Sequence, residues 1–445
     1  MTHGENDLVQ AMSDGEWFEG SADDPVVVRA GLIRELLLGR HGELDPRGVR
    51  VRGARVVGVL DLDQVRAVVG LHLADCVVEE PIRATRAVLP YLTLDGSRIA
   101  GLVADGARVD GGLFLRRVRA EGEVRLLDAH VGGQFDADDA EFTSTSGTAL
   151  YATRMRLDGG FFLRRARIRG VGERGAARFV GSRFGGQVVF AGARLENPTG
   201  PVLDLHESTV DGTVFLPAEV VCPDGSREDD CDHPARVELD NFGFSSIGYL
   251  DWRQWLHLVR CHTTAYHASP YQRLAAVERA AGHDGNARRI LIAQQGDLLR
   301  RSPAAVGGPV TRFSHRLWGA LAGYGYRTRR TAAALLLAVT AAGLLGYAAG
   351  QVDTRPGHHA AERTVQPGSP SPAVGVACSS VELVGLGLDR GLPLGPTGLR
   401  SRCDLDTGTR WGQAFTVAIW VIQAALWGLA TLALAGYTNL VRKSA

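Results

Sequence analysis

The sequence predicts a mainly β protein, in which a β-solenoid is joined by a small α-helical segment to two C-terminal transmembrane helices. Three observations support this class. Short phrases of alternating apolar and polar residues, often ending in glycine, recur every ten or eleven positions between about Val49 and Val220. A longer repeat is superposed, because DGGLFLRRVR from Asp110 returns as DGGFFLRRAR from Asp158. Two long stretches near the end of the chain contain no Asp, Glu, Arg, Lys or His.

Composition places the chain among ordinary folded proteins. Of 445 residues, 45% are hydrophobic and 22% are charged, which excludes wholesale disorder. The formal net charge is zero, and the repeats from Val49 to Val220 contain 22 arginines and 22 acidic residues. A balanced surface of this kind is a poor binder of phosphates and a poor mimic of DNA. We therefore expect no nucleic-acid partner.

The repeated phrases indicate short strands separated by tight turns. Side chains that alternate with period two suit a strand, and glycine at a fixed spacing suits a turn. Two phrases make one repeat of about 20 to 22 residues, a length typical of stacked coils. Small residues at Ala54, Ala107 and Ala129 are then expected to face a crowded interior. A sandwich of hairpins is the alternative.

Both ends of a stack of strands need covering, because open strand edges invite aggregation. The segment VVVRAGLIRELLLG from Val26 is predicted to be an amphipathic helix at the N-terminal end. The aromatic-rich segment from Asn241 to His267 is predicted to cover the other end. From Ser269, two antiparallel helices are expected, separated at Gly282. They form either a packing element or a peptide-binding groove.

The two uncharged stretches, Thr331 to Val352 and Trp411 to Val441, each exceed the roughly 20 apolar residues that span a bilayer. By the positive-inside rule both termini are cytoplasmic, and the loop from Asp353 to Arg410 faces outward. The spacing of Gly346 and Gly350 allows close helix approach. The basic residues that flank the spans are Arg300, Arg301, Arg312, Arg316, Arg327, Arg329, Arg330, Arg442 and Lys443.

These features divide the chain into six regions, and the acidic N-terminus lacks the features of a secretory signal. The predicted regions are an N-terminal helical cap (1–48), a β-solenoid (49–222), a capping region with the helical pair and basic juxtamembrane segment (223–330), a first transmembrane helix (331–352), an extracytoplasmic loop (353–410), and a second transmembrane helix with a short tail (411–441).

Six cysteines offer two kinds of site. Cys378 and Cys403 lie in the predicted outer loop, where an oxidising exterior favours a disulfide over two separate thiols. Soft metal ligands are available elsewhere, but Cys222 and Cys231 lack the tight spacing of strong structural zinc sites. We therefore expect no metal. The weak candidates for metal ligands are Cys222, Cys231, His233, Cys261 and His262.

Two further motifs have weak claims to chemistry. GVGERG, from Gly170 to Gly175, matches a dinucleotide-binding spacing, but another repeat phrase follows it rather than a helix. We expect a turn insertion and no cofactor. Asp136, Asp138 and Asp139 form an acidic cluster suited to calcium or acid–base work, yet alternation predicts that Asp136 and Asp138 point outward into solvent. No catalytic residue is assigned.

The phrases GLFLRRVRAEGEVRLLDAHVGGQFDADDAEF, YLDWRQWLHLVRCHT and LWGALAGYGYRTRR resemble a family of membrane proteins from high-GC bacteria. Its members often carry the name "membrane-associated oxidoreductase", and their solenoids are similar to pentapeptide-repeat folds. The resemblance covers nearly the whole chain and implies a bacterial plasma-membrane location. One departure is Ala137, where the family often has cysteine. The resemblance supplies no catalytic residues.

The sequence favours a non-enzymatic protein-interaction scaffold that is tethered to the membrane and binds a protein partner or forms a homo-oligomer. The repeats provide extended surface, and no catalytic constellation stands out. An oxidoreductase is the alternative that the family name implies. An envelope-stress sensor acting through the outer loop is the second alternative.

Overall fold

A computed structural model describes residues 3–20, 26–222, 231, 233–325, 328–364, 377–392 and 402–443. The chain divides into two compact units, Met1–Asp297 and Leu298–Ala445. We call them the sheet unit and the helical unit. Arg327 and parts of the predicted outer loop lie outside the described residues.

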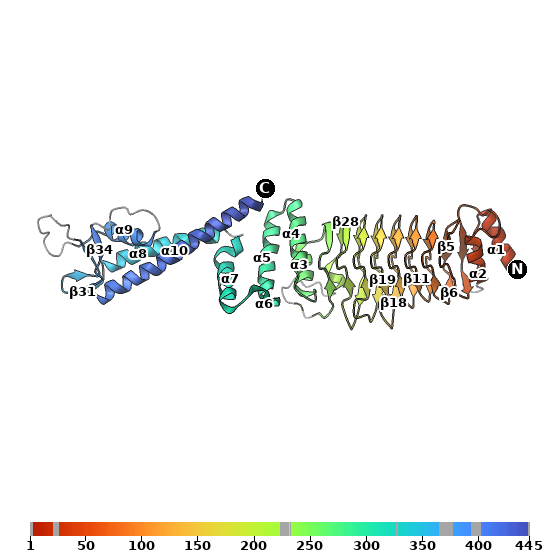
Figure 1. The fold of residues 1–445 in the computed structure, drawn as a ribbon, viewed down its shortest axis with the longest axis horizontal. Coiled ribbons are helices and arrows are strands. Elements are labelled where there is room, and N and C mark those ends of the chain that lie inside the picture. Colours follow the sequence, from red (N-terminus) through yellow and green to blue (C-terminus); the bar gives the residue numbers. More distant parts are fainter. Residues whose placement is uncertain are drawn as a thin grey trace. The chain divides into compact units, whose positions relative to one another are not determined.

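The sheet unit contains three large sheets in which all strands run parallel (Figure 1). From β5 to β24, each strand pairs with the strand four places further along the chain. The 15-stranded sheet has the order β1 (Phe18–Glu19), β3 (Val49–Arg52), β5 (Leu71–Ala74), β9 (Leu92–Thr93), β13 (Leu113–Phe114), β17 (Phe135–Asp136), β21 (Phe161–Phe162), β25 (Val188–Val189), β28 (Thr209–Phe215), β24 (Arg183–Phe184), β20 (Arg156–Leu157), β16 (His130–Val131), β12 (Arg108–Val109) and β8 (Val88–Leu89), with β30 (Gly243–Ser246) paired to β28.

Two smaller sheets complete the unit. The 8-stranded sheet has the order β2 (Val26–Arg29), β4 (Ala54–Val57), β6 (Val77–Val78), β10 (Arg98–Ile99), β14 (Arg119–Ala120), β18 (Glu141–Thr143), β22 (Arg167–Arg169) and β26 (Arg194–Glu196). The 7-stranded sheet has the order β29 (Val237–Glu238), β27 (Leu203–Asp204), β23 (Ala177–Arg178), β19 (Leu150–Tyr151), β15 (Val124–Arg125), β11 (Leu102–Val103) and β7 (Ile82–Arg83).

The predicted fold class, a mainly β solenoid similar to the pentapeptide repeat, is wrong as a description of this chain. Helices make up about 35% of it and strands about 24%, and the strands form open parallel sheets, a composition consistent with an α/β fold. The physical reason lies in strand length. Many strands contain only two residues, so each long repeat adds little strand, whereas the helices are long.

The core of the sheet unit follows the alternation of the sequence. Leu113 and Leu115 are buried, and the intervening Phe114 is partly exposed. Ala54, Ala107 and Ala129 are buried as expected from their place in the phrases. Aromatic rings gather in one part of the core, where Phe161 has no exposed surface. Its ring neighbours are Phe135, Phe179, Phe184 and Phe190.

Turns between the strands require a left-handed backbone that glycine adopts most easily. Gly106 and Gly192 occupy this position with φ of 62° and 68°. Elsewhere a charged residue takes the same conformation, as Asp139 and Arg165 do with φ of 58°. The Arg165 guanidinium donates to the Asp139 carboxylate at 2.6 and 2.7 Å. Such a backbone is unfavourable for a non-glycine residue, and because this paired hydrogen bond is exposed to water it offsets little of that cost.

Helices cover both ends of the sheet unit (Figure 1). At the N-terminal end lie α1 (His3–Asp14) and α2 (Ala30–Leu37). The segment from Val26 begins as strand β2, not as helix, because it pairs in register with β4. At the other end lie η1 (Ala218–Val220), α3 (Trp252–Cys261), α4 (Ser269–Ala280) and α5 (Asp284–Arg301), the last of which continues past the unit boundary.

A buried ion pair ties these terminal helices together. Asp297 on α5 has no exposed surface, and its Oδ2 accepts from Arg260 Nε of α3 at 3.0 Å and from the Tyr271 hydroxyl of α4 at 2.8 Å. Between α4 and α5, Gly282 has φ of 81°, which ends the first helix. Removing one partner from the buried pair of Asp297 and Arg260 would cost several kcal/mol of folding stability.

The helical unit contains two helices long and apolar enough to cross a membrane, with candidate spans Arg330–Ala349 and Arg410–Thr431. They belong to α8 (Thr328–Ala349) and α10 (Arg410–Lys443). The remaining elements are α6 (Pro303–Val306), α7 (Pro309–Ala322), η2 (Gly323–Gly325), α9 (Ser380–Gly391), and two strand pairs formed by β31 (Asp353–Arg355) with β32 (His358–His359) and β33 (Ala361–Arg363) with β34 (Cys403–Leu405).

Helix α9 packs directly against α8. A Cβ atom added to Gly346 would lie 2.3 Å from the Leu383 carbonyl oxygen, and one added to Gly387 would lie 2.1 Å from the Ala342 carbonyl oxygen. The backbones of the two helices therefore touch, which only glycine permits. The small-residue spacing at Gly346 thus serves packing against α9.

Candidate functional site

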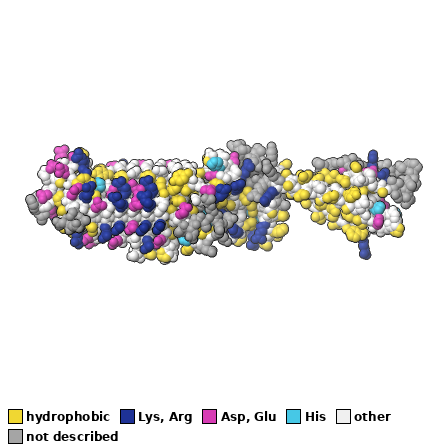
Figure 2. Space-filling view, turned by 180° about the vertical axis from the view of Figure 1, so that it is seen from behind, with side chains coloured by type: hydrophobic (Ala, Val, Ile, Leu, Met, Phe, Trp, Pro, Cys, Tyr) yellow, Lys and Arg dark blue, Asp and Glu magenta, His cyan; other side chains and the backbone are white. Residues whose placement is uncertain are grey.

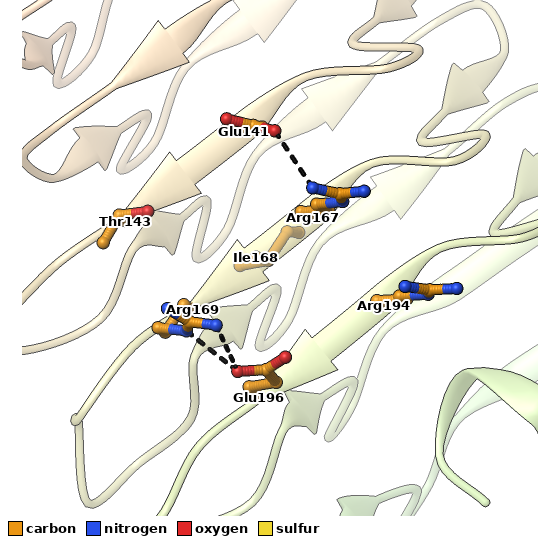
Figure 3. Close-up of a pocket in the computed structure, with 7 residues that line it drawn as sticks. All are labelled: Glu141, Thr143, Arg167, Ile168, Arg169, Arg194 and Glu196. Carbon is orange, nitrogen blue, oxygen red and sulfur yellow. Dashed lines mark hydrogen bonds and ion pairs between the residues drawn. The ribbon is translucent and has the colours of Figure 1, made fainter. Parts of the chain in front are cut away.

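A hollow of about 320 Å³ lies on the exposed face of the 8-stranded sheet (Figure 3). Strands β18, β22 and β26 supply every lining residue. The first and third residues of each strand are at least partly exposed, and the buried Ile168 lies between Arg167 and Arg169. Register places Glu141 beside Arg167, and Arg167 beside Arg194. The lining residues are Glu141, Thr143, Arg167, Ile168, Arg169, Arg194 and Glu196.

Ion pairs hold part of this hollow in place. Arg167 Nη1 lies 3.4 Å from Glu141 Oε1, and Arg169 Nη2 lies 2.8 Å from Glu196 Oε2. Both arginine side chains remain 66% exposed, so water screens these pairs and each contributes little stability. Arg194 is also exposed. The hollow therefore presents three guanidinium groups and two carboxylates, and this excess of one positive charge suits a carboxylate-bearing ligand.

A second hollow of about 730 Å³ adjoins the first and shares Arg169 and Glu196 with it. Its lining is more apolar. The other lining residues include Val171, Leu195, Pro198, Pro201, Val202, Pro234 and Ala235. We call the two hollows together the groove. It passes from a cationic part to an apolar part beside β26, the last strand of the 8-stranded sheet.

Charged side chains elsewhere on the sheet unit form rows that run across the strands, from one strand to the next (Figure 2). The predicted acidic cluster belongs to these rows. Arg164 Nε donates to Asp138 Oδ2 at 2.6 Å, and Arg165 holds the pKa of the Asp139 carboxyl below its usual range by hydrogen bonding. The expectation that Asp136 points into solvent is wrong, because only 7% of it is exposed and burial raises the pKa of its carboxyl.

A different cluster lies at the C-terminal end of the sheet unit. The ligand atoms of Cys222, Cys231, His257 and His262 all lie within 4.8 Å of one another. Three of the side chains are buried, and Cys231 is partly exposed. Burial also lowers the pKa of the His262 imidazole, which favours its neutral form.

Three of the five weak candidate ligands are thus brought together, and two are not. His233 and Cys261 lie outside the cluster, although the His233 ring centroid is 6.3 Å from that of His262. Sequence reasoning missed His257. The available signal was its spacing of five from His262, within the range found for paired histidine ligands.

The remaining predicted site residues are also located. Cys378 and Cys403 are joined by a disulfide with Cα atoms 6.3 Å apart. The GVGERG segment forms a loop between β22 and β23, so it lacks the helix that a dinucleotide site requires. Cys76 is buried, and burial raises the pKa of its thiol to about 11.

No family model, curated protein or solved structure matches the chain. The features of the described residues that bear on its function are the groove, the cysteine–histidine cluster and the two candidate spans.

Proposed function

We propose that this chain is a membrane-anchored, non-enzymatic scaffold whose groove binds an acidic and partly apolar segment of a partner protein. The observation that supports this proposal most directly is the row of Arg167, Arg169 and Arg194 in the cationic part of the groove. Arg167 and Arg194 are direct neighbours in register, so their guanidinium groups project side by side. Glu141 faces Arg167 and Glu196 faces Arg169, so the excess positive charge that an acidic ligand would neutralise is that of Arg194.

The second hollow supports the same proposal. Its apolar lining adjoins the cationic part, so an extended segment could place acidic side chains on the arginines and apolar side chains over Leu195 and Val202. A mixed groove of this kind discriminates partners by both charge and shape.

For location, we propose a two-pass protein of the bacterial plasma membrane with both termini in the cytoplasm. Basic residues gather before the first span, among them Arg300, Arg301, Arg312 and Arg316. The cysteines agree with this orientation. The disulfide lies in the segment between the spans, which would face the oxidising side, whereas no disulfide joins Cys76, Cys222, Cys231 and Cys261 of the sheet unit.

Site-specific photo-crosslinking in intact cells tests the proposal. A photoreactive residue at Thr143, in the groove, should give a discrete adduct in the membrane fraction, and the same residue at Arg183, on β24, should not. The double charge reversal R167E/R194E should abolish the adduct. The matched control is R156E/R183E, which reverses two exposed arginines that are also neighbours in register.

Two outcomes contradict the proposal. One is the absence of any adduct from the Thr143 position; the other is an adduct that R167E/R194E and R156E/R183E reduce equally. An adduct of twice the chain mass would identify the partner segment as part of a second copy.

A further inference from the structure

The cysteine–histidine cluster has the donor set of a structural zinc site. Thiolates and imidazoles are the ligands that zinc prefers, and two of each recur in closed tetrahedral sites. The four donors come from three separate parts of the chain. Cys222 follows η1, Cys231 lies before β29, and His257 and His262 lie in and directly after α3.

Two donor-pair distances are close to those expected around one shared ion, and all four donor atoms lie within 4.8 Å of one another. Zinc–sulfur bonds of about 2.3 Å and zinc–nitrogen bonds of about 2.0–2.1 Å place tetrahedral donor pairs roughly 3.8 Å apart for sulfur and 3.3 Å apart for nitrogen. Here the Sγ atoms of Cys222 and Cys231 are 3.4 Å apart. The Nε2 atoms of His257 and His262 are 3.2 Å apart. Both pairs are within about half an ångström of the tetrahedral values.

The outer contacts of the cluster favour a metal as well. His262 Nδ1 lies 2.9 Å from the Ala235 carbonyl oxygen, so this nitrogen donates its proton to the carbonyl. The Nε2 lone pair is thereby directed into the cluster. A histidine oriented by a backbone carbonyl in this way is typical of zinc ligands.

The site lies where the 7-stranded sheet ends. Its terminal strand β29 pairs with β27 on one side, and on the other the Val237 amide donates to the His262 carbonyl oxygen at 2.7 Å. The segment around His262 therefore covers the last strand edge. Joining Cys222, Cys231 and α3 through one ion would fix this cover in place.

We propose that Cys222, Cys231, His257 and His262 bind one zinc ion that holds the C-terminal cap on the sheets. Four protein ligands leave no open coordination position, so the role is structural. Metal binding to such a set contributes directly to folding stability. The inference is independent of the partner segment proposed for the groove.

Metal analysis of the full-length chain tests this proposal. The protein is purified in detergent without chelators or alkylating agents, and zinc is measured by mass spectrometry. A separate portion of the cells is lysed with an alkylating agent to trap thiols and disulfides. We expect one zinc ion per chain, lost in C222S and in C231S. The matched controls C261S and H233Q change the two candidate residues that lie outside the cluster, and both should keep the metal.

Cobalt substitution keeps the test decisive if a variant fails to fold. The wild-type chain loaded with cobalt(II) should show the ligand-field bands of a tetrahedral ion and a thiolate-to-cobalt charge-transfer band. H257Q should weaken cobalt binding but retain the charge-transfer band. Only trace zinc in the wild-type chain, equal zinc in C222S and C261S, or a disulfide between Cys222 and Cys231 in the alkylated protein would each overturn the proposal.

Discussion

Replacing Phe161 by alanine should destabilise the sheet unit far more than replacing the adjacent Phe162. Phe161 has no exposed surface, its ring stacks on Phe135 with centroids 4.7 Å apart, and it meets Phe179 and Phe184 at 5.1 and 5.2 Å. Truncation of a buried phenylalanine costs about 3–5 kcal/mol, because packing is lost and a cavity remains. Phe162 points to the opposite face, where Arg164 lies 5.0 Å from its ring, and such a partly exposed contact contributes about 0.5–1 kcal/mol.

Thermal unfolding of the detergent-solubilised full chain, followed by circular dichroism, measures both changes. At roughly 2–4 °C per kcal/mol, F161A should lower the Tm by about 6–20 °C and F162A by only about 1–4 °C. The two residues are neighbours on β21, so the pair controls for position and residue type. If F162A lowered the Tm as much as F161A, the assignment of inward and outward faces on this strand would be refuted.

Three other measurements test particular contacts. G346V should displace α9 and lower the stability of the helical unit by about 1–3 kcal/mol, seen as a lower Tm, whereas G428V, with open space around the added side chain, should have little effect. Because burial raises the pKa of the Cys76 thiol to about 11, iodoacetamide at neutral pH should label it only after denaturation, as read by mass spectrometry; labelling of the folded chain would contradict this. Burial lowers the pKa of the His72 imidazole, so the folded state resists its protonation and stability falls as the pH drops below about 6.5. H72Q should flatten the fall in Tm between about pH 7 and pH 5, and an unchanged slope would assign the acid sensitivity to other groups.

The sequence predicted local features of the sheet unit well, because they depend on nearest neighbours. Alternation placed Leu113 and Leu115 inside, and the small residue after each turn, such as Ala107, is buried. The predicted fold class was wrong because the repeats are the most regular pattern in the sequence, yet each contributes strands as short as two residues, as at Leu113–Phe114. Most helical residues lie in segments that are not repeated, so the repeat pattern gave no indication of how much helix the chain contains.

Contacts between distant segments could not be predicted from spacing. Cys222 and His262 are forty positions apart, and only the covering of strand β29 by the segment after α3 brings them together. Asp136 was expected in solvent because strict alternation assigns it outward, yet it lies at the end of β17, where the turn folds its carboxylate back to accept from the Asp138 amide at 3.1 Å. Turn geometry overrides alternation at such positions.

The groove and the cysteine–histidine cluster share one structural element. Ala235 lines the apolar part of the groove, and its carbonyl oxygen accepts the hydrogen bond that orients His262. The rigidity of the groove wall at Ala235 therefore depends on the segment around His262, which covers the edge of β29. If an ion joins Cys222 and Cys231 to α3, it stiffens the surface that a partner segment would contact, without touching that segment. A structural metal and an interaction surface are then complementary features of the same end of the sheet unit, because preorganising a binding wall reduces the entropy lost when the partner binds.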